Sequence, residues 1–245
     1  MKRFFSILII FCAVFSVSAK NNESLEYLKN SRKTAYRQKT ISGDAVEMQE
    51  IWGWVMQSRF SEFDNALPLT DVGFFAADVD SYGNLANVPD RSKLANFPGR
   101  VHLVLVCDSK SLTHFVLDPK FGLADNMIKQ IMEAAEPFDG INVDYELIPA
   151  KDGQNFLNFL EKLKNECKKN GKMFTVCVPA RIRTIEDDVF PYKKIADMAD
   201  RVMIMAYDEH WSTSRPGPIA SMNWCEKIAG YAVTVIPQEK LVRAF

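Results

Sequence analysis

The sequence lacks the residue spacings that mark several common kinds of site. It contains no Cys-x-x-Cys pair, and His102, His114 and His210 do not combine with cysteines at zinc-ligand spacing, so we expect no metal site. It also lacks Gly-x-Gly-x-x-Gly and the P-loop pattern, which disfavours a nucleotide-binding enzyme. No cofactor is predicted.

The charge of the chain has no bias toward either sign. It carries 30 basic and 31 acidic residues, a net charge of -1, so we expect no sequence-independent binding to nucleic acid or to anionic lipid. The composition, 47% hydrophobic and 25% charged, is that of an ordinary globular protein with a substantial core.

The first residues have the pattern of a secretory signal peptide. Lys2 and Arg3 precede an apolar run that begins at Phe4, and small residues end the pattern at Ala19. The run is shorter than the roughly 20 residues needed to span a bilayer, so we predict no stable membrane anchor. Residues 1–19 therefore predict export, to the periplasm and cell envelope or to the outside of the cell. Residues 20–47 are charged, and we predict that they form a linker with some helix. We predict that residues 48–245 form the folded domain.

Four cysteines follow the predicted signal peptide, and none is close to another in the sequence. Export permits disulfides, but two of the four lie in apolar, strand-like runs. We therefore expect buried free thiols. The four are Cys107, Cys167, Cys177 and Cys225.

Apolar, β-rich runs recur along the folded domain, with helical patterns between most of them. The clearest helical pattern spans 153–171, where Gly171 is expected to end the helix, and 125–135 and 224–235 are similar. This alternation predicts parallel βαβ units and an α/β fold of the TIM-type (β/α)8 barrel class. An open, doubly wound sheet is the alternative that periodicity alone leaves open. The seven runs begin at Glu50, Asp71, Arg100, Gly140, Lys172, Arg201 and Lys240.

Polar and apolar residues alternate along the fourth run. In a strand, Asn142, Asp144 and Glu146 share one face, which in a barrel points into the lumen near its open top. Two carboxyl groups about 6.5–7 Å apart cannot ionise independently, and a glycosidase keeps a general acid protonated in this way. The alternative is a solvent-facing strand whose carboxylates are simply hydrated.

Two segments together carry a resemblance to a known family. Asp139 to Glu146, "DGINVDYE", resembles the glycoside hydrolase family 18 signature Asp-Gly-x-Asp-x-Asp-x-Glu, and "MAYDEHW" from Met205 resembles the family's Met-x-Tyr-Asp motif. The chain looks most like the bacterial branch that acts on peptidoglycan, including spore cortex-lytic N-acetylglucosaminidases. Asn142 departs from the usual Asp, and it cannot take a proton from Asp144.

The resemblance implies substrate-assisted hydrolysis with net retention, an exception to the scheme of two catalytic carboxylates. Glu146 would protonate the glycosidic oxygen, Asp144 would hold the acetamide N–H, and Tyr207 would hydrogen-bond the acetamide oxygen. The substrate is then a polysaccharide, with peptidoglycan and chitin-like glycans both left open. The implied substrate-binding residues are Asn142, Asp208, Trp211 and Asp139.

The roles of several other side chains have two interpretations each. Trp52, Trp54 and Trp211 could stack on sugar rings or pack in the core, and His210 could be a subsite donor or an ordinary loop residue.

The length predicts an incomplete barrel. From Glu50 to Leu241 the chain has room for about six βα units and the start of a seventh strand, roughly 60 residues short of eight units. A truncated product is the preferred explanation; a second chain that completes the barrel and a stable, degraded relative are the others. The alternatives to an active glycosidase are therefore a non-catalytic glycan-binding protein, an inactive truncated relative and a structural protein of the envelope.

Overall fold

The computed structural model describes residues 48–244, which belong to one compact unit. The predicted signal peptide and the charged segment 20–47 lie outside the described residues. No helix in the part that the structure describes is long and apolar enough to cross a membrane.

A single sheet forms the centre of this unit. Its parallel strands follow the order β1-β2-β4-β5-β6-β7-β8, and β3 (Leu85–Ala86) pairs antiparallel with β2. All seven predicted runs are parallel strands. Their bounds are β1 Trp52–Met56, β2 Asp71–Val79, β4 Arg100–Val106, β5 Gly140–Asp144, β6 Met173–Pro179, β7 Arg201–Met205 and β8 Leu241–Ala244.

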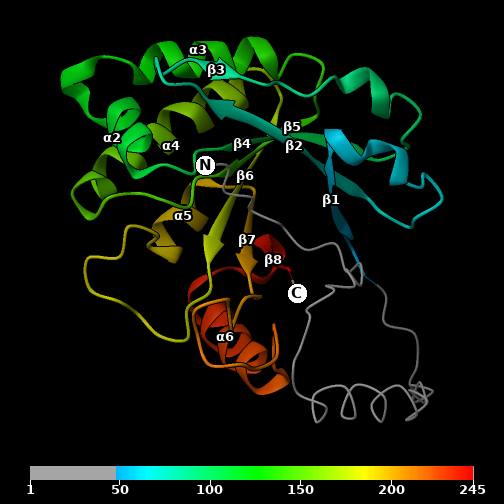
Figure 1. Cartoon of the computed structure of the whole chain (residues 1–245), viewed down its shortest axis with the longest axis vertical. Coiled ribbons are helices and arrows are strands. Elements are labelled where there is room, and N and C mark those ends of the chain that lie inside the picture. Colours follow the sequence, from blue (N-terminus) through cyan, green and yellow to red (C-terminus); the bar gives the residue numbers. More distant parts are fainter. Residues whose placement is uncertain (1–47, 245) are drawn as a thin grey trace, which may run out of the picture. The chain divides into compact units, whose positions relative to one another are not determined.

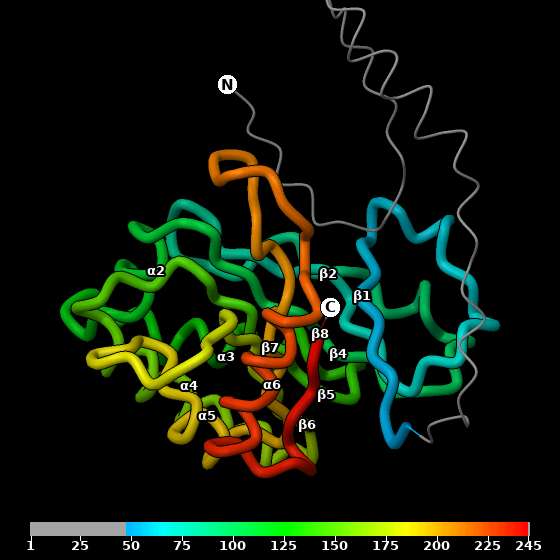
Figure 2. The backbone as a smooth tube through the Cα atoms, turned by 90° about the horizontal axis from the view of Figure 1, so that it is seen from below, coloured from blue at the N-terminus to red at the C-terminus, as the bar shows by residue number. Residues whose placement is uncertain are grey.

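The sheet curls but does not close among the described residues, because β1 and β8 pair only with β2 and β7. Figure 2 shows β1 in blue and β8 in red at the two ends of the sheet. The molecule is therefore an incomplete TIM-type barrel, which confirms the predicted fold class and excludes the doubly wound alternative.

Helices cover the outer face of the sheet, and α2 to α5 lie together on one side of the strands in Figure 1. Two precede β5, and one precedes each of β6, β7 and β8. Their bounds are α2 Lys110–Leu117, α3 Ala124–Ala134, α4 Gly153–Lys169, α5 Tyr192–Met198 and α6 Met222–Val235.

The first two crossovers carry no α-helix, so the prediction of six complete βα units is wrong in this detail. They contain only the 3-10 turns η1 (Gln57–Glu62) and η2 (Arg91–Leu94) and the short β3. Proline and glycine interrupt these segments and disfavour longer helices. The interrupting residues are Pro68, Gly83, Pro89, Pro98 and Gly99.

The longest helix, α4, forms as its sequence pattern predicts. Its last turn carries Lys168 and Lys169, which complement the negative end of the helix dipole. Gly171 follows with a φ of 64°, the left-handed conformation in which glycine commonly ends a helix. Its buried face consists of Phe156, Phe159, Leu160, Leu163 and Cys167.

The two faces of β5 meet different surroundings. Ile141 and Val143 join the core beneath the helices, and the ring of Tyr145 continues this face, 5.9 Å from that of Phe159 on α4. Because side chains alternate along a strand, Asn142 and Asp144 point the other way, into the half-barrel. Asn142 and Asp144 are both buried there, so the solvent-facing alternative is wrong for these two residues.

A network of ion pairs joins the amino ends of distant strands. Glu50, just before β1, accepts from Nη2 of Arg201 at 2.7 Å and from Nη2 of Arg100 at 2.8 Å. Arg100 also donates through Nε to Asp71 at 2.6 Å, and Nε2 of His102 lies 2.8 Å from the same carboxylate. Burial alone would raise the pKa of Asp71, but the hydrogen bonds from His102 and Arg100 hold that pKa well below its usual range.

This network requires a curled sheet. Five strand-to-strand steps separate β1 from β7, about 24 Å on a flat sheet at about 4.8 Å a step. That span exceeds the combined reach of a Glu and an Arg side chain. The contact between Glu50 and Arg201 therefore exists only because the strands bend around a common interior.

We predict that Glu50→Gln lowers the free energy of unfolding by about 2 kcal/mol at pH 7, because three charge-assisted hydrogen bonds from Arg100 and Arg201 weaken together. Burial would raise the pKa of Glu50, but hydrogen bonds from Arg201 and Arg100 lower it. The stabilisation is therefore present above the unfolded-state pKa and is lost as the pH falls through the lower, folded-state value. Urea unfolding at pH 7 and pH 3 measures this.

The control is Glu62→Gln, which removes an exposed pair with Arg59 and should cost no more than about 0.5 kcal/mol. Equal losses of stability in the two variants at pH 7 would refute the bridging role of Glu50.

Candidate active site

Polar residues gather at the carboxyl ends of the parallel strands, on the open top of the half-barrel. Asp144 ends β5 and Glu146 follows it by two residues, Tyr207 and Asp208 come just after β7, and Asp108 comes just after β4. The carboxyl ends of barrel strands are where the residues of a TIM-type active site meet.

Asp144 is the most buried carboxyl group of this set. Only 6% of it is exposed, and its Oδ1 has no hydrogen-bond partner among the described residues. Burial, and then the negative charge of Glu146, raise the pKa of Asp144 to about 7, while a hydrogen bond from the Cys177 thiol acts in the opposite direction. Asp144 therefore presents a free acceptor on the inner face of the half-barrel.

Glu146 lies at the rim and is exposed. Its surroundings still favour the protonated form, because partial burial and then the charges of Asp208 and Asp108 raise its pKa. Asp208 has a φ of 61°, in the left-handed region that non-glycine residues seldom occupy. The rim thus combines an accessible carboxyl group with nearby negative charge.

Tyr207 is half-buried beside these carboxyl groups. Burial raises its pKa above the usual value, and Cys177, Asp144 and Glu146 raise it further. Its hydroxyl therefore stays protonated at neutral pH and can donate a hydrogen bond. Tyr207 is therefore within electrostatic range of Asp144 and Glu146.

Asn142 forms the floor beneath Asp144. Its Nδ2 donates to Oγ1 of Thr175 at 2.9 Å and lies 3.3 Å from Sδ of Met203, and its Oδ1 accepts from Sγ of Cys177 at 3.3 Å. Asn142 is fully buried, so it supports the site from below.

Asp139 does not belong to this cluster, which corrects its assignment as a substrate-binding residue. It precedes β5 at the opposite end of the strand, roughly 16 Å from Asp144 at about 3.3 Å a residue. Its Oδ2 accepts from the backbone nitrogen of Val101 at 2.8 Å and lies 3.6 Å from Nη2 of Arg91. It joins the start of β4 to η2 and is a structural residue.

The aromatic side chains proposed as sugar contacts lie in different parts of the fold. Trp52 lies at the amino end of β1, its ring 4.4 Å from that of His102, so it cannot form a sugar platform at the other end of the strands. Trp54 is half-buried on the same face, one step nearer the top. Trp211 is 62% exposed on the loop after β7, and no contact joins it to the carboxyl groups. His210 binds the carbonyl oxygen of Pro218 within that loop at 3.0 Å.

Two residues of the cluster, Asp108 and Cys177, were not predicted from the sequence as site residues. Asp108 carried a usable signal, because it directly follows an apolar strand. Cys177 carried no such signal, because a cysteine in an apolar run is ordinarily expected to pack in the core. The described cysteines are free and buried, as predicted.

A histidine between carboxylates on α2 resembles a metal site but does not fit one. Nδ1 of His114 lies 2.8 Å from Asp152, and Nε2 lies 3.5 Å from Asp118 and 3.0 Å from Nζ of Lys151. Both carboxylates already pair with the histidine ring, and the positive charge beside Nε2 is supplied by the Lys151 ammonium. The cluster therefore joins α2 to the turn before α4.

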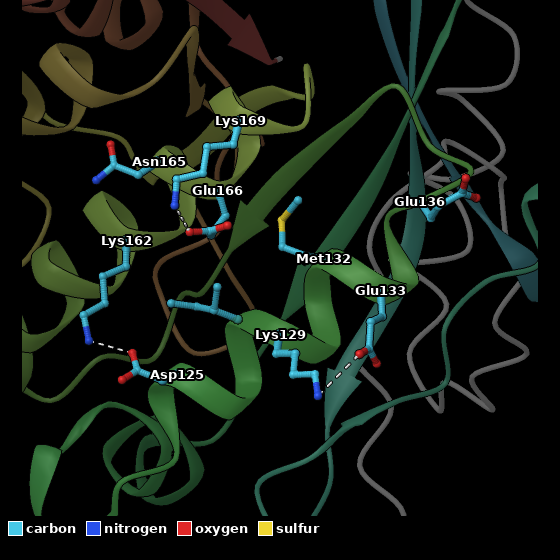
Figure 3. A pocket seen from close by; sticks show the side chains of 10 residues that line it. Asp125, Lys129, Met132, Glu133, Glu136, Lys162, Asn165, Glu166 and Lys169 are labelled. Atoms are coloured by element: carbon cyan, nitrogen blue, oxygen red, sulfur yellow. Dashed lines mark hydrogen bonds and ion pairs between the residues drawn. The ribbon is translucent and has the colours of Figure 1, made fainter.

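A groove of about 830 Å³ lies between α3 and α4 on the helical face (Figure 3). Its charged residues pair with one another, as in Lys162 with Asp125 at 2.6 Å and Lys169 with Glu166 at 2.6 Å. No predicted site residue lines it, so the groove is separate from the candidate active site.

The profile of Glycosyl hydrolases family 18 matches residues 109–243, more than half of the chain. The chain belongs to this family. The two motifs that suggested the resemblance, from Asp139 and from Met205, lie within the matched residues.

Curated relatives in the family are longer than this chain. An uncharacterized glycosylase of Bacillus subtilis is 32% identical over 107 residues, which cover 42% of this chain and 31% of that protein. The cortical fragment-lytic enzyme of Bacillus anthracis is 22% identical over 188 residues, which cover 71% of this chain and 44% of the enzyme. This chain thus spans less than half of either relative.

Solved structures of a spore cortex-lytic enzyme and of a chitinase share the fold. The spore cortex-lytic enzyme SleL of Bacillus megaterium superposes with a TM-score of 0.69 at 21% identity, covering 79% of this chain and 49% of SleL. A class V chitinase of Pseudomonas fluorescens gives 0.70 at 19% identity, covering 78% and 66%.

We predict that Asp144→Asn stabilises the protein at pH 8, by on the order of 2 kcal/mol or more, and has little effect near pH 4. The raised pKa means that the folded protein keeps a proton which the unfolded chain releases between about pH 4 and about pH 7. Stability therefore falls through that window, and asparagine removes the loss. Urea unfolding across this range provides the measurement.

Asp197→Asn is the matched control, because Asp197 is an exposed helix residue paired with Lys193 and should change stability by no more than about 0.5 kcal/mol. A stability of Asp144→Asn that parallels the parent protein at every pH would contradict the prediction.

Proposed function

We propose that this chain hydrolyses β-1,4 bonds next to N-acetylglucosamine in peptidoglycan or a chitin-like glycan, with Glu146 as the general acid. The observation that supports this most is the pairing of two different carboxyl groups. Asp144 is buried with a free acceptor oxygen, and Glu146 is accessible with a raised pKa.

Glu146 is suited to protonate a glycosidic oxygen. A general acid must hold its proton near the working pH and reach the leaving group. The raised pKa supports the first requirement, and the position of Glu146 on the rim supports the second. As the proton moves to the glycosidic oxygen, the bond from that oxygen to the anomeric carbon breaks.

The substrate's own acetamide supplies the nucleophile in this proposal, as in the substrate-assisted branch of glycoside hydrolysis. Its carbonyl oxygen bonds to the anomeric carbon and forms an oxazolinium ion. The ionised Asp144 accepts the acetamide N–H and stabilises the positive charge, and the Tyr207 hydroxyl donates to the acetamide oxygen. Water then attacks the anomeric carbon and gives up a proton to Glu146, so the configuration is retained.

Asp208 is proposed to contact the sugar from the loop after β7. Asn142 acts through its hydrogen bonds beneath Asp144 rather than by touching the substrate, because it is fully buried. Trp211 remains a proposed sugar contact on the same loop.

The names of the relatives support this class of substrate. The names of the curated relatives include cortical fragment-lytic enzymes, and the structural neighbours include chitinases as well as SleL. Both kinds of polymer carry N-acetylglucosamine. The pattern of residues 1–19 supports export, which would bring the protein to an envelope or extracellular glycan.

We predict that Glu146→Gln lowers kcat on a fluorogenic N-acetylglucosaminide by roughly 10²- to 10⁴-fold, because the amide cannot donate an acidic proton. Glu136→Gln is the matched control, since Glu136 is exposed on the helical face away from the site and should leave the rate unchanged.

Equal rates for the parent and Glu146→Gln would reject the catalytic role. Sedimentation with insoluble peptidoglycan and with chitin distinguishes the alternative, in which the protein binds glycan without turnover. That alternative predicts binding by both proteins and product from neither.

We also predict that Asp108→Asn moves the basic limb of the pH–rate profile to lower pH. The charge of Asp108 helps to raise the pKa of Glu146, so its removal lets the general acid ionise earlier. Initial rates from pH 4 to pH 9 test this, with Asp125→Asn on the helical face as the control. A basic limb that stays in place would show that Asp108 does not act on the general acid.

A further inference from the structure

Cys177 lies on the inner face of β6, not in the core beneath the helices. Its strand neighbours Val176 and Val178 pack in that core, whereas Cys177 does not. It is 5% exposed, pairs across the sheet with Met203 of β7, and faces Asn142 of β5. The thiol therefore sits under the carboxyl cluster, between the strands that bear it.

The orientation of the Asn142 amide is fixed by Thr175. The Thr175 hydroxyl donates to the carbonyl oxygen of Ile141 at 3.1 Å, so its oxygen is left to accept, and Nδ2 of Asn142 donates to it. Oδ1 of Asn142 then faces Cys177 and can only accept. The thiol must be the donor.

Asp144 is the second acceptor for this thiol. The register of β5 and β6 pairs Val143 with Val176, so its continuation by one residue places Cys177 beside Asp144 on the inner face, and among residues 48–244 no hydrogen bond reaches Oδ1 of Asp144. The thiol has one proton and two acceptors. A charged carboxylate is the stronger acceptor and an amide oxygen the weaker, so ionisation of Asp144 should draw the S–H away from Asn142.

We propose that Cys177 is a positioning residue for the family 18 reaction, whose thiol turns from Asn142 to Asp144 and holds the Asp144 carboxylate in its ionised, substrate-facing state. Its part in the reaction rests on the function proposed above, whereas its effect on Asp144 does not. The thiol is not a nucleophile, because burial raises its pKa well above the usual value and keeps it protonated.

The groups that face Asp144 are few. Glu146 raises the pKa of Asp144 through its charge, and the Cys177 thiol lowers it; Tyr207 is coupled to the same charge. Loss of the thiol hydrogen bond should therefore raise the pKa of Asp144 above about 7. A hydroxyl in the same place should restore the bond.

The test is a carbon-13 NMR titration of aspartate carboxyl groups in the full-length protein, with the Asp144 signal assigned by its absence in Asp144→Asn. We expect the pKa of Asp144 to rise by roughly half to one pH unit in Cys177→Ala. In Cys177→Ser it should stay at or below the parent value. Cys167→Ala, which removes a buried thiol on α4, is the control and should cause no shift.

An unchanged Asp144 pKa in Cys177→Ala, or the same rise in Cys177→Ser, would overturn the proposal. If Cys177→Ala does not fold, Cys177→Val fills the space without a donor and should give the same rise. The acid limb of kcat/KM should move with the pKa in Cys177→Ala and return in Cys177→Ser. Absence of turnover in every variant would reject the proposed function, and the titration would still decide the role of the thiol.

Discussion

The contact between Glu50 and Arg201 is the constraint on which the geometry of this half-barrel depends. It joins the residue before the first parallel strand to the start of the sixth, and Arg100 at the start of the third strand shares the same carboxylate. A flat sheet would hold these groups too far apart. The ion pairs and the curl therefore depend on each other, and the polar base stabilises the arrangement in which the inner faces of the strands point to one interior. The shape of the site at the opposite end of the strands depends on that base.

The curl gives the inner face of β5 its unusual environment. On a surface strand Asp144 would be hydrated, but here the neighbouring strands remove it from water without supplying a strong donor. Such a carboxyl group reduces stability above its pKa, since the unfolded chain ionises more easily. Active sites commonly retain groups of this kind because the unmet acceptor is available to the substrate. Glu146, at the open top, is exposed, as the proposed reaction on a glycan requires.

Sequence patterns predicted what depends on local periodicity and missed what depends on contacts across strands. The alternation around Asp144 predicted an inward polar face, and the structure agrees because one strand fixes which side chains share a face. Asp139 was misassigned since it lies within the same motif, although the length of the strand places it at the other end. Cys177 could not be recognised from the sequence, because its role depends on its contact with Asn142 on the adjacent strand. The first two crossovers lack α-helices because proline and glycine interrupt them. The prediction relied on the regular spacing of the strands and did not weigh these residues.

Asn142 changes how protons can move in the site. Cys177 donates to Asn142, Asn142 to Thr175, and Thr175 to the backbone oxygen of Ile141. Every hydrogen bond in this chain is given by a group that stays neutral, so none of them can take up a proton from Asp144. An aspartate at this position would add a third carboxylate and a proton acceptor below the site. With asparagine there, no carboxyl group lies at this position beneath Asp144, and Glu146 at the open top is the carboxyl group that acts on the pKa of Asp144. In the proposed reaction, proton transfer to and from the glycan therefore takes place at the open top, where Glu146 is exposed.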